Sequence, residues 1–188
     1  GLIETITTGI DATGEPTKIN GFYLNNNTTF TNEKPYVIYG YAAVPANKTL
    51  TIEAGARLHF HEDSGLIVFE NASLKVNGAF SNNQELLENE VIFESDRLEP
   101  LFEDIPGQWG TIWLFEGSKN NIINYATIKN ATIGVLSDGD PEGTGDIFSG
   151  INNSKLTISN TQIYNSASFG IIGRNTSITG ENLVITNS

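Results

Sequence analysis

The segment Ser137–Asp146 holds the residues whose types and spacing are best suited to binding a metal ion. It contains four carboxylates: Asp138, Asp140, Glu142 and Asp146. Alternate carboxylates converge on a hard cation in calcium loops, and a glycine such as Gly143 permits the turn. Ser149 stands where such a loop has its bidentate glutamate. The segment is therefore either a calcium site or a solvated acidic loop, and the missing glutamate favours the solvated loop.

The two histidines are a second candidate for metal chemistry. His59 and His61 are separated by a single residue, so on a strand they share one face. Glu62 and Asp63 follow at once, and imidazoles at this spacing with carboxylates can hold zinc or nickel. No third ligand is visible in the sequence. We therefore favour two surface histidines beside an acidic turn.

The aromatic residues suggest sugar binding, because sugar rings stack their apolar faces on flat side chains. Five of them are candidates for such a platform: Tyr36, Tyr39, Tyr41, Trp109 and Trp113. Trp113 lies within an apolar strand pattern, which predicts a core position. The ligand-binding candidates are then Trp109, Tyr39 and Tyr41. The alternative for Trp109 is that it packs the Ser95–Pro106 segment onto the body of the protein.

A repeat indicates which elements must position these side chains. Lys155–Ser166 matches Ser177–Ser188 at an offset of 22, and Asn120–Ala131 precedes Lys155–Ser166 in the same frame at an offset of 35. The unit is too short for a helix pair and is rich in β-branched residues, Asn, Thr and Ser. A period of this kind predicts a stacked architecture. We interpret it as an all-β fold, a single-stranded right-handed parallel β-helix (solenoid) with about 22–24 residues per coil.

The pattern of strands divides the chain into two parts. Residues 1–35 are polar and predict a loop-rich N-terminal segment or cap, whereas residues 36–188 predict the β-helix. Apolar residues alternate with polar ones at Leu50 and Ile52 and again at Leu74 and Val76, which indicates short strands. Three isoleucines should stack in one inward column: Ile128, Ile163 and Ile185. Three asparagines at equivalent turns predict an amide ladder: Asn130, Asn165 and Asn187.

The composition excludes several function classes. The 188 residues carry a net charge of −12, which argues against binding nucleic acid or anionic membranes. There is no Cys for a disulfide, a thiolate metal site or a nucleophile, and neither histidine lies near a candidate serine nucleophile. No apolar run is long enough to cross a membrane. The absence of Met and the strength of the last strand suggest a fragment that continues past Ser188.

Four segments together resemble a known family: Thr49–Phe60, Ser73–Gly78, Val91–Ser95 and Pro106–Trp113. This succession is similar to that of Bacteroidota cell-surface lipoproteins with a right-handed parallel β-helix of the pectin-lyase type. The resemblance implies export and attachment to the cell surface or outer membrane through a lipid anchor that this chain lacks. Most members have no established activity, and the signatures of polygalacturonases are absent here. The resemblance therefore implies a fold and a location rather than a reaction.

We therefore expect a non-enzymatic, surface-exposed β-helix that serves as an interaction or assembly module of a cell-surface lipoprotein. The alternative is a carbohydrate-binding or polysaccharide-cleaving β-helix. A surface protein or a glycan is the expected partner, with no nucleic acid and no direct membrane insertion. Calcium is the one cofactor that the sequence suggests.

Overall fold

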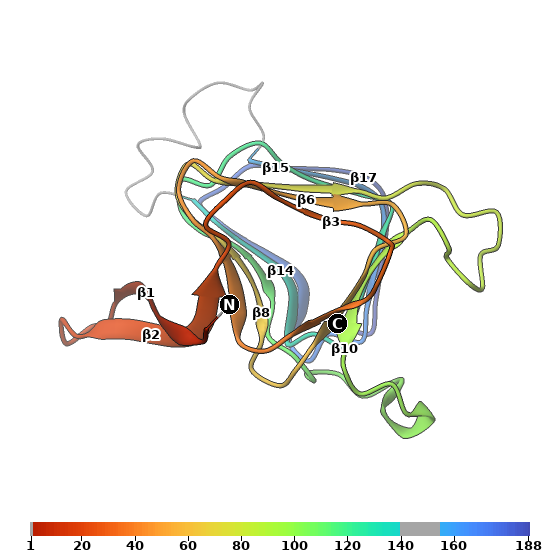
Figure 1. Ribbon diagram of the computed structural model, residues 1–188, viewed down its shortest axis with the longest axis horizontal. Helices are drawn as coiled ribbons and strands as arrows, with labels where there is room; N and C mark the ends of the chain where they lie inside the picture. The colour runs from red at the N-terminus through yellow and green to blue at the C-terminus, as the bar shows by residue number, and fades with distance from the viewer. Residues whose placement is uncertain (1, 140–154) are drawn as a thin grey trace.

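The computed structural model describes residues 2–139 and 155–188, whose regular structure is almost entirely β (Figure 1). The exception is η1 (Pro100–Phe102), a turn of 3-10 helix. Within the described residues the strands form two sheets, and every strand pair after the first is parallel. The predicted all-β chain of parallel strands is confirmed. No helix in the described part of the chain is long and apolar enough to cross a membrane.

The stacked strands lie on three faces, because each strand pairs with the third strand after it until β15 spans two faces. The first face contains β3 (Thr28–Phe30), β6 (Thr49–Glu53), β9 (Ser73–Asn77), β12 (Asn121–Asn124), the start of β15 (Leu156–Tyr164) and β17 (Ile178–Thr186). The second contains β4 (Tyr36–Ile38), β7 (Arg57–Phe60), β10 (Val91–Ser95), β13 (Ala126–Lys129) and the end of β15. The third contains β5 (Tyr41–Val44), β8 (Gly65–Val68), β11 (Ile112–Leu114), β14 (Ile133–Asp138) and β16 (Phe169–Arg174).

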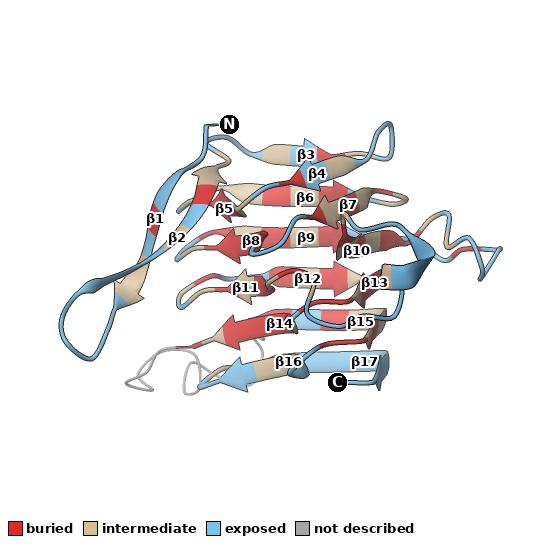
Figure 2. Ribbon diagram, turned by 90° about the horizontal axis from the view of Figure 1, so that it is seen from below, coloured by how far each residue is buried: buried red, intermediate tan, exposed pale blue. Residues whose placement is uncertain are grey.

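The apolar core lies inside the three faces and follows from the period-two alternation of the strands. Leu50 pairs with Leu74, and both side chains are fully buried. Ile128 pairs with Ile163, and Ile163 pairs with Ile185, so the predicted isoleucine column is confirmed. Figure 2 shows the burial decreasing at the last layer, where Ile185 of β17 is 45 % exposed.

The number of residues in each layer of three strands varies, because longer segments of chain interrupt some of the corners between the faces. Ile52 of β6 pairs with Val76 of β9, which is one short turn later in the chain. Val76 in turn pairs with Ile123 of β12, and the chain between these two residues is about twice as long. The two segments that lengthen this turn, residues 79–90 and 96–108, lie on either side of β10 and are called here the first and second excursions.

Asparagines occupy many corners, where the backbone enters the left-handed region that Asn tolerates. Asn187 donates to the Asn165 side chain at 3.3 Å, as the predicted ladder requires. Asn130 does not extend this ladder, because the amide of Asn165 donates to the carboxylate of Asp104, in the second excursion, at 3.3 Å and not to Asn130. The second excursion thus takes the hydrogen bond that the neighbouring corner would have received.

The N-terminal segment differs from the predicted loop-rich cap. β1 (Glu4–Ile10) and β2 (Pro16–Tyr23) form an antiparallel hairpin, and β2 joins the third face by pairing with β5. The stacked strands begin at β3 and not at residue 36. The carboxylate of Asp11 accepts hydrogen bonds from Thr13 and Glu15, which closes the hairpin turn. Ile6 is the hairpin's buried anchor against the third face.

Candidate functional site

The two excursions project beside β10 on the outside of the second face (Figure 1). Residues 79–108 contain eight of the chain's 22 acidic residues and one of its ten basic residues, Arg97. Their net charge of −7 is more than half of the chain's −12. The negative charge of the protein is therefore concentrated around β10.

The same excursions also expose large apolar side chains. Five of them are between 43 % and 78 % exposed: Phe80, Leu86, Leu98, Leu101 and Ile105. Single exposed apolar residues are ordinary, but a group of them within polar surroundings marks interaction sites in soluble proteins. The excursions thus combine negative charge with apolar surface.

A row of charged side chains lies on the outer face of the strands between the excursions. His59 of β7 lies beside Glu94 of β10, and Lys129 of β13 forms an ion pair with Glu94 at 2.7 Å. These side chains are only 12–20 % exposed. Burial lowers the pKa of Lys129, but the hydrogen bond to Glu94 and neighbouring carboxylates outweigh burial, so the net shift is upward. Lys129 is therefore a firmly protonated cation.

Hydrogen bonds from two side chains, Arg57 and Gln108, hold the bases of the two excursions. The guanidinium of Arg57 donates to the carbonyls of Leu87 and Glu90 at 2.8 and 2.7 Å, which holds the first excursion to β7. The side-chain amide of Gln108 donates to the carbonyls of Phe102 and Ile105 and closes the second excursion on itself. Each excursion is thus fixed at its base.

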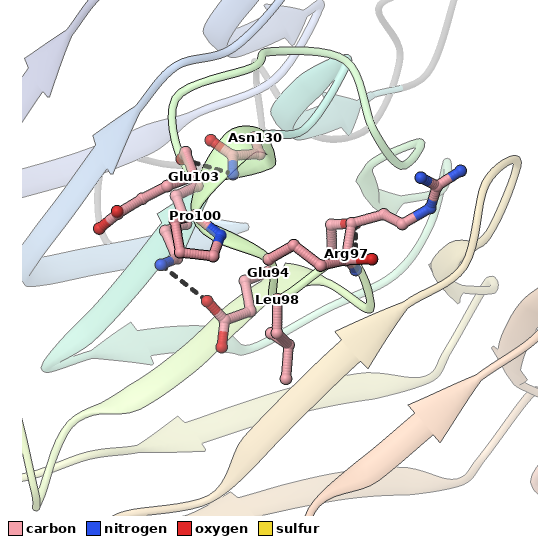
Figure 3. A pocket seen from close by; sticks show the side chains of 9 residues that line it. Glu94, Arg97, Leu98, Pro100, Glu103 and Asn130 are labelled. Atoms are coloured by element: carbon pink, nitrogen blue, oxygen red, sulfur yellow. Dashed lines mark hydrogen bonds and ion pairs between the residues drawn. The ribbon is translucent and has the colours of Figure 1, made fainter.

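A pocket of about 190 Å³ lies where the second excursion meets β10 and β13 (Figure 3). Seven of its lining residues are polar or charged: Glu94, Ser95, Arg97, Glu99, Glu103, Lys129 and Asn130. In Figure 3 the carboxylates of Glu94 and Glu103 lie on the same side, and the Arg97 guanidinium points away from them. Arg97 lies over the ring of Phe102 at 4.6 Å instead. The pocket is therefore richer in hydrogen-bond acceptors than in donors.

Both histidines point outward, as the alternation with Leu58 and Phe60 predicts. The Nδ1 atom of His61 lies 2.8 Å from the carboxylate of Asp96, and the His61 ring also contacts the Tyr39 ring in a tilted arrangement. Each histidine thus faces its own carboxylate one strand away. Within residues 2–139 and 155–188 there is no group of three or more His, Asp or Glu side chains placed to hold a metal ion.

The predicted sugar platform is not assembled. Trp109 is 1 % exposed, stacks on Phe60 with ring centres 4.4 Å apart and donates to the carbonyl of Lys129. Neither face of its ring is therefore available to a sugar. Tyr41 is half-buried beside the hairpin, and Tyr39 is exposed.

Trp113 is predicted to be a core residue, but it lies outside the main core and packs, half-buried, against a second apolar cluster of Ile6, Ala43 and Ile67. Ile112 and Leu114 are the inward residues of β11, so Trp113 lies on the outer side of the third face. There it packs with Phe115, which in turn contacts Phe69. These aromatics form a cluster that the sequence pattern did not identify.

The candidate calcium segment is described only at its start. Asp138 ends β14, and its carboxylate pairs with Arg174 at 2.5 Å and accepts a hydrogen bond from Trp113 at 2.7 Å. Both of its oxygens are thus engaged by protein donors. Asp140, Glu142 and Asp146 lie outside the described residues. Asp138 therefore acts as a structural ion-pair partner between β14, β16 and β11.

Searches of protein-family models, curated proteins and solved structures find no match to this chain. The resemblance to Bacteroidota lipoproteins remains an expectation based on its motifs.

Proposed function

We propose that this chain is an interaction module in which a right-handed parallel β-helix displays the two excursions to a partner protein. The short sequence repeat and the three stacked faces support this fold. Its rigid faces hold the excursions at a fixed separation around β10. The acidic, cysteine-free composition and the motif resemblance support a place at the cell surface, on a lipid-anchored protein.

One observation carries this function: negative charge and exposed apolar side chains occur together in residues 79–108. Charge complementarity steers an oppositely charged partner, and apolar side chains supply area that is removed from water on contact. The partner that fits this surface is a basic protein segment with apolar side chains. We propose binding and not a reaction, because the charged side chains on the strands themselves, His59, Glu94 and Lys129, contact one another.

This function predicts selective binding of short peptides that are both basic and apolar. We expect a double variant, Leu98→Ser with Leu101→Ser, to bind such a peptide roughly tenfold more weakly, because both side chains are exposed contact area. Fluorescence polarisation with a labelled peptide of alternating Lys and Leu measures the dissociation constant. Raised salt should weaken binding further by screening the charges.

Two controls make this test specific. Ile10→Ser removes an equally exposed apolar side chain from β1, away from the excursions, and should leave the affinity unchanged. An acidic peptide of the same apolar content should not bind. Equal binding of acidic and basic peptides, or an equal loss in Ile10→Ser, would contradict the proposal.

The aromatic cluster on the third face favours a second candidate function, glycan binding. Phe69, Trp113 and Phe115 lie in one cluster, and a cleft of about 320 Å³ beside it is lined by Phe115 and the Asp138–Arg174 ion pair. Apolar ring faces next to fixed polar groups suit a sugar, which has both kinds of surface. This surface is separate from the excursions, so the two candidates can be tested independently.

The second candidate predicts saturable binding of oligosaccharides that depends on Phe115. We expect Phe115→Ala to lose most of the affinity because it removes the ring beside the cleft, and Tyr39→Ala to have no effect. Calorimetric titration with neutral and uronate oligosaccharides, with and without calcium, measures this. The absence of binding by all of these sugars, or equal binding by Phe115→Ala, would remove the glycan candidate.

A further inference from the structure

A further pocket, of about 210 Å³, lies between the second excursion and the corner that follows β7. It shares only Arg97 with the pocket at β13. Sites for drug-sized ligands have volumes of roughly 300–1,000 Å³, so this smaller pocket fits a single side chain. Phe102, Ile105 and Pro106 form its apolar part, and Ile105 is 43 % exposed. The pocket thus presents apolar surface that a partner can reach.

The apolar part of this pocket is held in place by hydrogen bonds within the protein. The side-chain amide of Gln108 donates to the carbonyls of Phe102 and Ile105 at 2.6 and 2.7 Å. The backbone amide of Gly107 donates to the carbonyl of Ala131, which ties the end of the excursion to the stacked strands. A pocket that is already ordered loses little conformational entropy when it is filled, and this favours its use as an anchor.

The polar part of the pocket presents a hydrogen-bond acceptor. His61 lines the pocket, and its side chain is 46 % exposed. Its Nδ1 atom lies 2.8 Å from the carboxylate of Asp96, which selects the neutral tautomer with the proton on Nδ1. The Nε2 atom is then an acceptor, and it has no hydrogen-bond partner among the described residues. A ligand of this pocket therefore needs one donor.

Flat groups in the lining favour an aromatic ligand. The guanidinium of Arg97 lines the pocket and lies over the ring of Phe102 at 4.6 Å. Rings and a guanidinium bind an aromatic ring by stacking and cation–π contact, which an aliphatic chain cannot form. Arg97 also disfavours a lysine or arginine at this position, because like charges repel. The side chain that combines a ring with a donor at its far end, at a size that suits this volume, is tyrosine.

We propose that this pocket binds a tyrosine side chain of the partner protein, with its ring against Phe102 and Ile105 and its hydroxyl donating to the Nε2 atom of His61. This inference rests on the proposed function and names the anchor of that interaction. The occupant belongs to a separate, basic protein, because the surrounding residues 79–108 carry a net charge of −7. Tyrosines in preformed pockets supply much of the binding energy of protein interfaces. Basic residues of the same segment then face the surrounding carboxylates.

p-Cresol reproduces the tyrosine side chain and tests the pocket without any peptide. Titrated into the ¹⁵N-labelled protein, it should shift the backbone amides of His61, Glu62 and residues 102–108 in a saturable way. Toluene lacks the hydroxyl and should bind roughly tenfold more weakly, because one hydrogen bond is lost. 4-Methylcyclohexanol lacks the flat ring and should also bind more weakly. Shifts spread over all exposed apolar residues, or equal affinities for p-cresol and toluene, would overturn the inference.

Variants assign the binding to the two parts of the pocket. His61→Phe keeps a ring beside Tyr39 but removes the acceptor, so p-cresol should bind it no better than toluene does. Ile105→Ser removes apolar contact area and should weaken the binding of both compounds. Both residues are exposed, so folding is retained. Leu101→Ser changes an exposed apolar residue of the same excursion that does not line the pocket, and it should bind p-cresol like the unmodified protein. An equal loss in Leu101→Ser, or unchanged binding in both His61→Phe and Ile105→Ser, contradicts the assignment.

The peptide assay separates this inference from the proposed function. One central leucine of the Lys–Leu peptide, replaced by tyrosine, should strengthen binding roughly tenfold, and phenylalanine should give only part of this gain. If the Lys–Leu peptide binds but tyrosine adds nothing, the anchor is wrong and the function stands. If p-cresol binds the pocket and no basic peptide binds, the pocket stands and the proposed function fails.

Sedimentation velocity tests the other possible occupant, a second copy of this chain. The protein alone should sediment as a monomer. A dimer that Ile105→Ser dissociates would place a second copy in the pocket and would overturn the inference.

Discussion

Ile163→Asp should unfold this protein at a much lower temperature than the unmodified chain. Ile163 is 1 % exposed and stands in a column between Ile128 and Ile185. An aspartate there loses the apolar contacts and places a carboxylate among apolar side chains that cannot pair with it. We expect a loss of at least about 4 kcal/mol, which corresponds to a fall in Tm of roughly 8–16 °C for a chain of this size.

Ile185→Asp is the matched control for this prediction. Ile185 occupies the same column one turn later but is 45 % exposed, so its carboxylate remains hydrated. We expect a loss within about 1 kcal/mol. Thermal unfolding followed by far-ultraviolet circular dichroism compares the two variants. Equal melting temperatures would mean that Ile163 is not an inward residue.

The strand pairing could be predicted from the sequence because inward side chains recur in register. The sequence matches of Ile163 with Ile185 and of Ile128 with Ile163 correspond to the observed pairs. Each match reflects a column in which one apolar side chain covers the next. The matches stay visible in the sequence because the longer chain between β14 and β15 changes only the offset, from 22 to 35 residues.

The N-terminal hairpin could not be predicted in the same way, because it contributes little to the core. Its strands are mostly exposed, and Ile6 is its one fully buried apolar side chain. The hairpin is held by antiparallel pairing and by the contact of β2 with β5. Gly14 lies in its turn, and Pro16 begins β2.

The charged row on the second face is visible in the sequence as a regular spacing. His59, Glu94 and Lys129 are evenly spaced along the chain, and Tyr164 continues the series. The spacing is uneven on the first face, where the first excursion, β10 and the second excursion all lie between β9 and β12. The hydrogen bond between Asn130 and Glu103 could not be predicted at all. It depends on the path of the second excursion, which places Glu103 against the Asn130 amide.

Trp109, a candidate for ligand binding or for packing the Ser95–Pro106 segment, is buried, whereas Trp113, a candidate core residue, is only half-buried. Trp113 lies in a strand, but the alternation places it outside because Ile112 and Leu114 face the core. Trp109 enters the core at a corner, where it bridges to Ala131 outside any extended strand. The alternation of inward and outward residues along the strand would have placed Trp113 correctly. Trp109 lies outside any such alternating pattern.

Trp109→Ala should therefore be strongly destabilising, by about 3–5 kcal/mol. The substitution opens a large cavity beside Phe60, whose ring stacks on the indole at 4.4 Å. It also removes the hydrogen bond from the indole to the carbonyl of Lys129. Chemical denaturation measures the loss, and Trp109→Phe should recover part of it by filling most of the cavity.

Trp113→Ala and Tyr39→Ala give the comparison that separates a core tryptophan from a sugar-binding one. Trp113 is half-buried and Tyr39 is 53 % exposed, so we expect smaller losses that decrease in that order. The remaining tryptophan in Trp113→Phe should emit at short wavelength and resist quenching by acrylamide, because Trp109 is shielded from water. A sugar platform requires the opposite result, with Trp109→Ala as stable as Tyr39→Ala and Trp109 readily quenched. Stability and quenching together thus decide whether this ring belongs to the core that supports the second excursion or to a binding surface.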